Sequence, residues 1–462
     1  MRQFFLIQAF LIAGLLLSAT VSAQDCICKT CRDVSAQRGP QWEQYWNRLR
    51  QEQRDNNPIP LPRGPGNTQI VFLDFDTGKD GTFVYTSQQR DEIQTNLEET
   101  YSGFDISFTQ TMPSGVFSTV FFNEGGVGGV AEDIDFRNLN KGDNAVLNAG
   151  IVGLTEQQIV TFSSNLASHE LGHLLGLRHA DSFGPIGQGM LPPLASFYDP
   201  PYLGPEMASE AFDHILGTPG VGIPLRDFFD DLNFVSERSS AKIGFSEDGL
   251  AVDDLESNDT IATAQALTLQ TIVAPNKIQV GNNAGSGDLS FSAVAAVGSL
   301  DASIDSLDIF RVDAKAGDLF TIEVYSNSVD RLALDPIDPN VSAFDAGGNF
   351  LDYYGGIAFN EHEFESSLDC NIWDLVIQND GPIFLQVDNT FAGDSGLYEL
   401  WVYRFNGIHG DVNCDGDLNL LDVAPFIDAL QSSDFTAKAD INLDGAVNLL
   451  DVSPFVGLLG GN

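Results

Sequence analysis

The sequence predicts a multidomain chain in which an α/β (α+β) unit, an all-β sandwich and a small all-α unit follow one another. Helical and strand-like apolar patterns alternate over residues 67–249, and short strand patterns separated by turn signals fill residues 250–405. An acidic loop followed by an apolar helical pattern occurs twice in residues 406–462. With 462 residues, of which 43% are hydrophobic, the chain can form several packed cores and is not globally disordered.

The first 23 residues have the layout of a secretory signal peptide. An apolar stretch from Phe4 to Leu17 follows Arg2, and the small residues Val21 and Ala23 precede a plausible cleavage site. A transmembrane anchor is the alternative, but this stretch is short for a span and no later run reaches about 18 apolar residues. We expect a mature chain without a transmembrane anchor that is secreted, extracellular or associated with a bacterial-type cell surface.

Residues 24–66 differ in charge from the rest and read as a basic prosegment or linker. The chain as a whole has 22 Lys+Arg against 65 Asp+Glu, a formal net charge of −43. Such a charge excludes a general nucleic-acid binder and argues against binding to anionic membranes. Three of the five cysteines, Cys26, Cys28 and Cys31, crowd into the basic segment, so the cores must be stabilised mainly by burial.

The α/β unit is predicted over residues 67–249. Strands are expected at 70–75, 104–108, 116–122 and 145–152, and helices at 87–101 and 156–177. The glycine-rich run 125–129 is expected to be a loop, since its glycines lack the spacing of a phosphate-binding turn.

The second of these helices carries a histidine constellation. His169 and His173 are four residues apart and lie on one face of a helix, where both imidazoles can bind one ion. Gly176 can end the helix and turn the chain so that His179 supplies a third ligand. Three protein ligands leave a position for water, which is the plan of a catalytic zinc site, and Glu170 is placed to act as general base.

These residues resemble the metzincin superfamily of zinc endopeptidases, whose motif is His-Glu-x-x-His-x-x-Gly-x-x-His, and the stretch up to His179 looks most like the matrixin branch. The resemblance implies a metzincin-like catalytic domain that hydrolyses protein or peptide substrates. It implies one Zn²⁺ held by His169, His173 and His179, with Glu170 as general base. Metzincins also place a methionine in a turn beneath the zinc. We expect Leu216 at that position, in preference to Met190 or Met207, and His214 as a turn residue.

Residues 250–405 are predicted to form the sandwich. Strands are expected at 291–297, 308–312, 319–325, 341–344, 383–387 and 397–403. The stretches 255–267 and 308–318 and the end at 396–401 look like the bacterial pre-peptidase C-terminal domain. That resemblance implies an accessory β-sandwich used for adhesion or spacing. His362 is expected to be a solvated surface residue.

The repeat in residues 406–462 has the ligand spacing of two calcium loops of the EF-hand type, with glycine at the sixth position. Position 12 is Asp where an ordinary EF-hand has Glu. The predicted ligands of two Ca²⁺ ions are Asp411, Asn413, Asp415, Asp417 (backbone), Asn419 and Asp422 in the first loop, and Asp440, Asn442, Asp444, Ala446 (backbone), Asn448 and Asp451 in the second.

The pair of loops resembles a type I dockerin, which implies a small all-α domain with paired EF-hand-like calcium loops and a cohesin-bearing scaffold or cell-surface protein as partner. The leucine pairs 420–421 and 449–450 are expected in its helical core, together with Phe426 and Phe455. Cys414 is expected to be exposed.

The combined prediction is a secreted zinc-dependent endopeptidase that docks through a calcium-loaded dockerin. The alternatives are a non-catalytic surface adhesin and a cohesin-bound subunit of an extracellular polysaccharide-degrading complex. A thiolate of the basic segment, from Cys26, Cys28 or Cys31, could occupy the open zinc position and keep the enzyme latent. A local disulfide or an exposed terminal tail is the alternative for those cysteines.

Overall fold

The structure is a computed structural model, and the following description is confined to the residues that it places. These are residues 68–78, 83–132, 134–150, 153–182, 186–187, 189, 198–204, 214–217, 227–248, 251–255, 257–275, 289–301, 307–326, 337–361, 369–389, 395–405, 410, 412, 418–431, 438–442 and 446–460. The predictions for the signal peptide, the basic segment with its cysteines, Met190, Met207, His362 and Cys414 lie outside the described residues.

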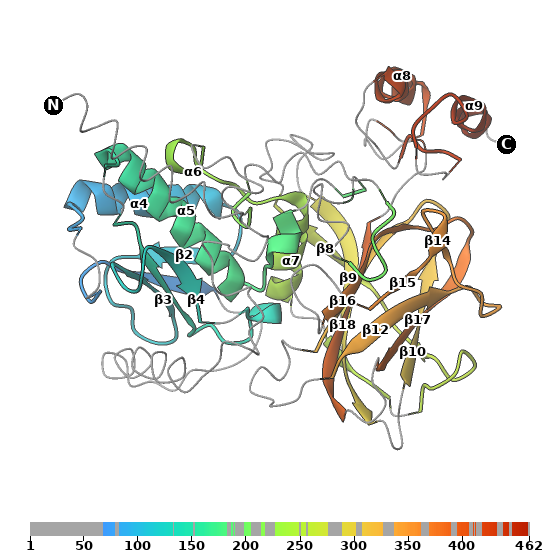
Figure 1. Ribbon diagram of the computed structural model, residues 1–462, viewed down its shortest axis with the longest axis horizontal. Coiled ribbons are helices and arrows are strands. Elements are labelled where there is room, and N and C mark those ends of the chain that lie inside the picture. Colours follow the sequence, from blue (N-terminus) through green and yellow to red (C-terminus); the bar gives the residue numbers. More distant parts are fainter. Residues whose placement is uncertain are drawn as a thin grey trace.

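A five-stranded sheet of order β2-β1-β3-β5-β4 underlies the first half of the chain (Figure 1). Four strands run parallel, and β4 pairs antiparallel with β5 at the edge. The bounds are β1 Gln69–Asp74, β2 Ile106–Thr109, β3 Ser118–Phe122, β4 Gly128–Ala131 and β5 Asn144–Asn148. The four predicted strands are confirmed with shifted ends. The prediction of a loop over residues 125–129 is wrong for Gly128 and Gly129, because these two residues belong to the edge strand β4.

Two helices cover one side of this sheet, α4 (Ser87–Thr100) and α5 (Glu156–Leu174) (Figure 1). Each begins with a capping box, in which the side chain of Thr86 or Thr155 accepts a hydrogen bond from the backbone of the glutamine three residues on. Every residue of α5 from Ile159 to Leu174 is buried, since the helix packs on β4 and β5 and also contacts α4 and α6 (Asp227–Asp230). The histidine helix is therefore held from several sides.

The second half is a β-sandwich of two sheets, with strand orders β15-β12-β17-β10-β7 and β16-β11-β18-β9-β6, and β8 paired with β9. Its long strands contain all six predicted segments. The bounds are β6 Ala251–Asp253, β7 Gln265–Ala266, β8 Gln270–Ala274, β9 Leu289–Asp301, β10 Leu307–Ala314, β11 Leu319–Tyr325, β12 Pro339–Phe344, β15 Phe359–Asn360, β16 Asp369–Val376, β17 Gly381–Asn389 and β18 Ser395–Phe405. A separate hairpin joins β13 (Asp352–Tyr353) and β14 (Gly356–Ile357).

Helix α7 (Glu237–Asp248) lies between the two halves and contacts both (Figure 1). It packs on β8 and β9 of the sandwich and touches the short helices η1 (Phe136–Asn138) and η2 (His179–Ser182) of the first half. Phe245 of α7 belongs to a buried cluster that includes Phe291 and Trp401 of the sandwich. The hydrophobic packing is thus continuous across the boundary that the sequence suggests at residue 249.

The C-terminal module contains η5 (Leu420–Asp422), α8 (Val423–Gln431) and α9 (Val452–Leu459). The rings of Phe426 and Phe455 stack with centroids 4.0 Å apart and join the two repeats at the module's core. The prediction that the leucine pairs at 420–421 and 449–450 are core residues is wrong, because these four side chains are 67–82% exposed. They lie just before the helices and outside their apolar faces. The chain is multidomain, with mixed sheets and this small helical module.

Candidate metal centre

The turn after α5 brings the third predicted histidine to the first two. The helix ends where Gly176 adopts φ 89°, a left-handed conformation that glycine takes without steric cost. The backbone N–H of Leu177 donates to the carbonyl of Gly172 at 2.9 Å and fixes the reversal. His179 then begins η2, directly opposite the exit of the helix.

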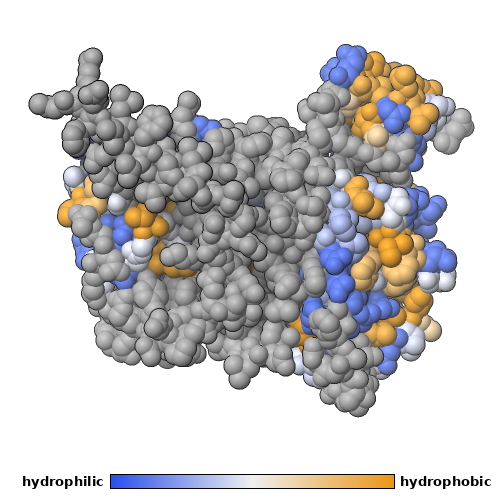
Figure 2. Space-filling model, in the orientation of Figure 1, coloured by the Kyte–Doolittle hydropathy of each residue, from blue (hydrophilic) through white to orange (hydrophobic). Residues whose placement is uncertain are grey.

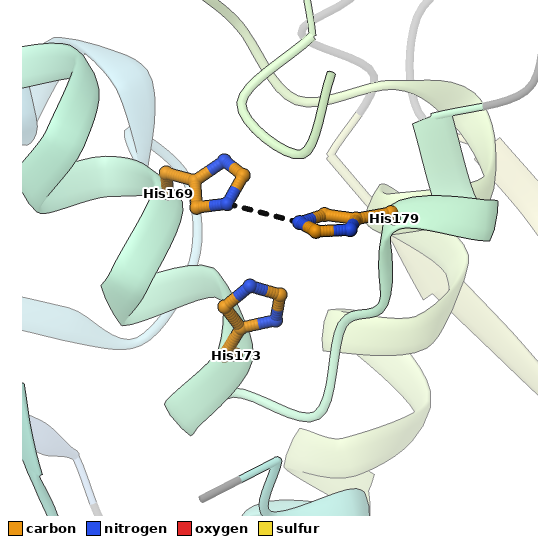
Figure 3. Close-up of side chains that lie close together, drawn as sticks. All are labelled: His169, His173 and His179. Atoms are coloured by element: carbon orange, nitrogen blue, oxygen red, sulfur yellow. Dashed lines mark hydrogen bonds between the residues drawn. The ribbon is translucent and has the colours of Figure 1, made fainter. Parts of the chain in front are cut away.

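The three imidazoles converge on one point (Figure 3). One ring nitrogen from each of His169, His173 and His179 lies within 4.8 Å of the others, and all three side chains are buried. Nε2 of His169 and Nε2 of His179 are 3.2 Å apart. Tetrahedral zinc with bonds of about 2.0–2.1 Å holds two ligand nitrogens about 3.3 Å apart. The separation of these two nitrogens therefore fits two ligands of one zinc ion, and His173 lies close enough to offer a third.

Backbone carbonyls select the tautomer of two of these rings. Nδ1 of His169 lies 2.6 Å from the carbonyl oxygen of Ile215, and Nδ1 of His173 lies 2.8 Å from that of Leu177. Because a carbonyl oxygen can only accept, each Nδ1 carries the hydrogen and each Nε2 presents its lone pair toward the centre. This is the outer hydrogen-bonding pattern of metal-bound histidines.

The helix is also anchored one residue before its first histidine. The hydroxyl of Tyr101 donates to the carbonyl oxygen of Ser168 at 2.6 Å. Burial raises the pKa of this tyrosine well above its ordinary value, so the hydroxyl keeps its hydrogen as a donor. The anchor fixes the backbone from which His169 projects.

Glu170 is fully buried beside the histidine cluster and faces the edge strand. A Cβ atom added to Gly129 of β4 would lie 2.4 Å from Oε1 of Glu170. The missing side chain of Gly129 thus makes the room that the carboxylate occupies. The sequence singled out Glu170 but not its neighbour on β4.

The turn 214–217 packs against α5. A Cβ atom added to Gly172 would lie 2.6 Å from Cδ2 of Leu216, so this buried leucine packs against the helix between His169 and His173. The preceding carbonyl, of Ile215, is the one that contacts His169. Among the described residues, the side chains grouped closely enough to hold a metal ion are His169, His173 and His179, and His214 is not one of them.

Part of the predicted calcium ligands can be placed. In the first loop, Oδ2 of Asp422 accepts from the backbone N–H of Asn419 at 2.8 Å. In the second, the two oxygens of Asp451 accept from the backbone N–H groups of Asn442 and Asn448, at 3.0 and 2.8 Å. In both repeats the position-12 aspartate therefore points back into its loop. This orientation compensates for the side chain of Asp, which is shorter than that of Glu.

The other ligand positions divide into placed and unplaced residues. Asp440 is buried, and Ala446 lies in the second loop. Asp411, Asn413, Asp415, Asp417 and Asp444 lie outside the described residues.

One family model matches the chain, and it covers the C-terminal module. Residues 409–454 match the dockerin type I domain. The chain is therefore similar to dockerins in this segment, where the sequence predicted one. No curated protein matches the chain.

Three solved structures show limited likeness. They are the periplasmic g-type lysozyme inhibitor PliG of Aeromonas hydrophila (18% identity, 24% of this chain and 85% of that one, TM-score 0.17), the pre-peptidase C-terminal domain of a Bacillus anthracis collagenase (17%, 24% and 87%, 0.18) and a promirolysin mutant of Tannerella forsythia (11%, 48% and 94%, 0.22). These TM-scores are too low to carry an argument about function.

Proposed function

We propose that the chain is a secreted zinc-dependent endopeptidase that docks to a partner through a calcium-loaded dockerin. The observation that carries the catalytic part is the convergence of three buried imidazoles beside the buried carboxylate of Glu170. In this proposal His169, His173 and His179 hold Zn²⁺, in a metzincin-like catalytic domain spanning residues 67–249. The sandwich over residues 250–405 is an accessory domain of the pre-peptidase C-terminal type.

Zinc in this centre would supply a Lewis acid that polarises a peptide carbonyl and lowers the pKa of a water molecule. The residues of the chain would transfer the protons and orient the metal ligands. Glu170 takes a proton from the attacking water and returns it to the leaving amine. The N–H groups at Nδ1 of His169 and His173 donate to fixed carbonyls, which keeps both rings in the metal-binding orientation.

Strand β4 supports a mode of substrate binding. It is the terminal strand in its sheet, and its residue Gly129 lies against Glu170. An extended peptide can add to such an edge through backbone hydrogen bonds, and Gly128 and Gly129 have no side chains to obstruct a close approach. A peptide paired with β4 would pass beside the general base, which suits an endopeptidase.

The dockerin supports calcium binding and a cohesin-bearing partner. The two Ca²⁺ ions would be held by the loops at 411–422 and 440–451. Figure 2 shows apolar surface gathered over the module that contains α8 and α9. The exposed apolar side chains of the module include Leu420, Leu421, Leu449 and Leu450, in equivalent positions of the two repeats. We assign these pairs to the partner-binding surface, because contiguous exposed apolar side chains mark interaction sites.

Export is the proposed fate of the chain, on the evidence of its signal-like first 23 residues and of the dockerin, whose partners are scaffold proteins. Within the described residues, no helix is both long enough and apolar enough to cross a membrane.

The catalytic proposal is tested with Glu170→Gln and the matched control Glu156→Gln, which makes the same change on the exposed first turn of the same helix. Cleavage of a denatured protein should fall about 10²–10⁴-fold in the first variant and stay unchanged in the second. Zinc content, measured by mass spectrometry, should equal that of the wild type in both. Equal cleavage by Glu170→Gln would refute the peptidase and leave the adhesin or a cohesin-bound subunit as the function.

A further inference from the structure

The turn that carries His179 is closed by the side chain of Asp181. Oδ2 of this aspartate accepts from the backbone N–H of Arg178 at 2.7 Å, and its own N–H donates to the carbonyl of Arg178 at 3.0 Å. Its carbonyl accepts from the hydroxyl of Ser236 at 2.9 Å. The conformation of η2, and with it the direction of the third imidazole, depends on this carboxylate.

The other carboxylate oxygen of Asp181 contacts a residue outside the turn of His179. It lies 2.6 Å from Nζ of Lys242 on α7, and the same ammonium lies 3.0 Å from Oε2 of Glu323 on β11. Lys242 also donates to the hydroxyl of Tyr325 at 3.0 Å. A chain of three ionic groups thus joins the turn of His179 to a strand of the sandwich.

Arg178, the residue before His179, makes a second connection to the same strand. Its guanidinium lies 3.6 Å from Oε1 of Glu323 and stacks over the ring of Tyr325, 4.4 Å from its centroid. The side chains of the four ionic groups, Arg178, Asp181, Lys242 and Glu323, are at most 5% exposed. Two cations face two carboxylates, so the cluster is balanced only when all four are present.

The charge on Glu323 is maintained within this cluster. Burial alone would raise the pKa of its carboxyl, but the charges of Lys242 and Arg178 outweigh burial and lower the pKa below its ordinary value. Apolar packing supports the same junction, since Ala180 belongs to the hydrophobic core of the sandwich. The peptide that carries the third histidine is therefore packed on the accessory domain as well as ion-paired to it.

We propose that the β-sandwich supports the zinc centre. Glu323 of the sandwich is a positioning residue, which acts through Lys242 and Asp181 to hold His179 toward the other two histidines. This inference rests on the proposed zinc site. It predicts that the sandwich sets metal affinity, a role that a spacer or an adhesion module does not have.

The test measures zinc affinity by competition with a chromophoric chelator, in the full-length protein carrying Glu170→Gln so that no self-cleavage intervenes. Added to that background, Glu323→Gln should weaken zinc binding about 10–100-fold, which is the loss typical of a residue that supports a metal ligand. Lys242→Met should have a similar effect. The double variant should lose no more than the worse single variant, because the two groups act in one chain.

A milder variant covers the case in which Glu323→Gln does not fold. Tyr325→Phe keeps the ring beneath Arg178 and removes the hydroxyl, which accepts from Lys242 and also hydrogen-bonds Glu323. Loss of one such hydrogen bond of about 1 kcal/mol corresponds to about fivefold in binding, so zinc binding should weaken by at least that factor. In protein loaded with Co²⁺, the visible absorption bands should shift in the same variants, since they report the ligand geometry.

The matched control is Asp374→Asn, in another buried ion pair of the same interface. Asp374 lies 2.7 Å from Arg238 and accepts from the N–H groups of Gly187 and Gly189, away from the turn of His179. The Asp374→Asn variant should have a lower unfolding temperature than the parent and a zinc affinity within twofold of the parent's. Equal zinc affinity in Glu323→Gln or Tyr325→Phe and the parent would overturn the inference, and so would an equal loss in Asp374→Asn. Substrate cleavage by the wild type reports separately on the proposed function.

Discussion

At the scale of single residues, the candidate site depends on the missing side chain of Gly129 as much as on the side chains of Glu170 and the three histidines. Glu170 is buried, and a buried carboxylate needs a defined space as well as favourable neighbours. That space exists because Gly129 on the edge strand has no Cβ atom. The space for the proposed general base is therefore left by a residue on a different element.

We predict that Gly129→Ala lowers kcat about 10–100-fold while zinc stays bound. The new methyl group would lie 2.4 Å from Oε1 of Glu170, so the carboxylate must move, and displacing a catalytic group by about 1 Å can cost about 10²-fold in rate. Steady-state cleavage and zinc content measure the two effects. Gly457→Ala, where a Cβ atom meets nothing within 4 Å, is the control and should cleave as the wild type does. An unchanged kcat in Gly129→Ala would show that Glu170 is not confined by β4.

At the scale of elements, prediction from the sequence succeeded where the cause is local. The placement of His169 and His173 on one face follows from helical spacing, and the approach of His179 follows from the freedom of Gly176. The glycine-rich run 125–129 predicts a loop, since glycine has low strand propensity, yet Gly128 and Gly129 belong to β4. Gly129 lies against Glu170, a residue of a later helix, so the local sequence does not indicate this contact.

Features that join distant segments could not be predicted in this way. Lys242 and Glu323 carry no local motif, and only the fold brings them to Asp181. The leucines at 420–421 and 449–450 have the residue type of a core but lie exposed, because they precede the helices that form it. Apolar composition indicates burial only when the element and its face are also correct.

The turn 214–217 offers a prediction at this scale, because it packs beneath the histidine helix. Leu216→Ala should destabilise the fold by about 2–5 kcal/mol, since it leaves a cavity against Gly172. It should also weaken zinc binding, because the neighbouring carbonyl of Ile215 orients His169. Leu216→Met conserves volume and should cost less than about 1.5 kcal/mol. Denaturant unfolding and chelator competition measure both quantities.

The control for this series is Leu255→Ala, at a leucine that is 59% exposed. Its stability should stay within about 0.5 kcal/mol of the wild type. If Leu216→Ala were equally neutral, the turn would not be a structural floor for the helix.

At the scale of the whole molecule, three cationic side chains are buried where the two described halves meet. The chain has 22 Lys+Arg for 65 Asp+Glu, yet Arg178, Arg238 and Lys242 are buried at this junction, each beside a carboxylate. A buried cation is costly unless it is paired, so these contacts favour one mutual arrangement of the halves. The acidic side chains that remain keep the outer surface negative, and some of them are concentrated in the two predicted calcium loops.

The last prediction concerns those loops. Replacing both position-12 residues, Asp422→Ala with Asp451→Ala, should abolish calcium-dependent folding of the module around α8 and α9 and leave zinc-dependent cleavage intact. Each aspartate points into its loop, and calcium at a hundredfold excess over its Kd stabilises a fold that it binds by about 2.7 kcal/mol. Limited proteolysis with and without calcium, at constant zinc, should show that the wild-type module is protected only when calcium is present and that the variant is digested in both conditions.

The control is Asp428→Ala, which replaces an exposed aspartate on α8, changes one charge outside the calcium loops and should behave as the wild type. Tryptophan fluorescence in the same samples reports on regions outside the module, including Trp373 and Trp401 of the sandwich, because residues 406–462 contain no tryptophan. A module that resists proteolysis equally without calcium would contradict the calcium sites, and a loss of the sandwich signal would contradict its independence from them.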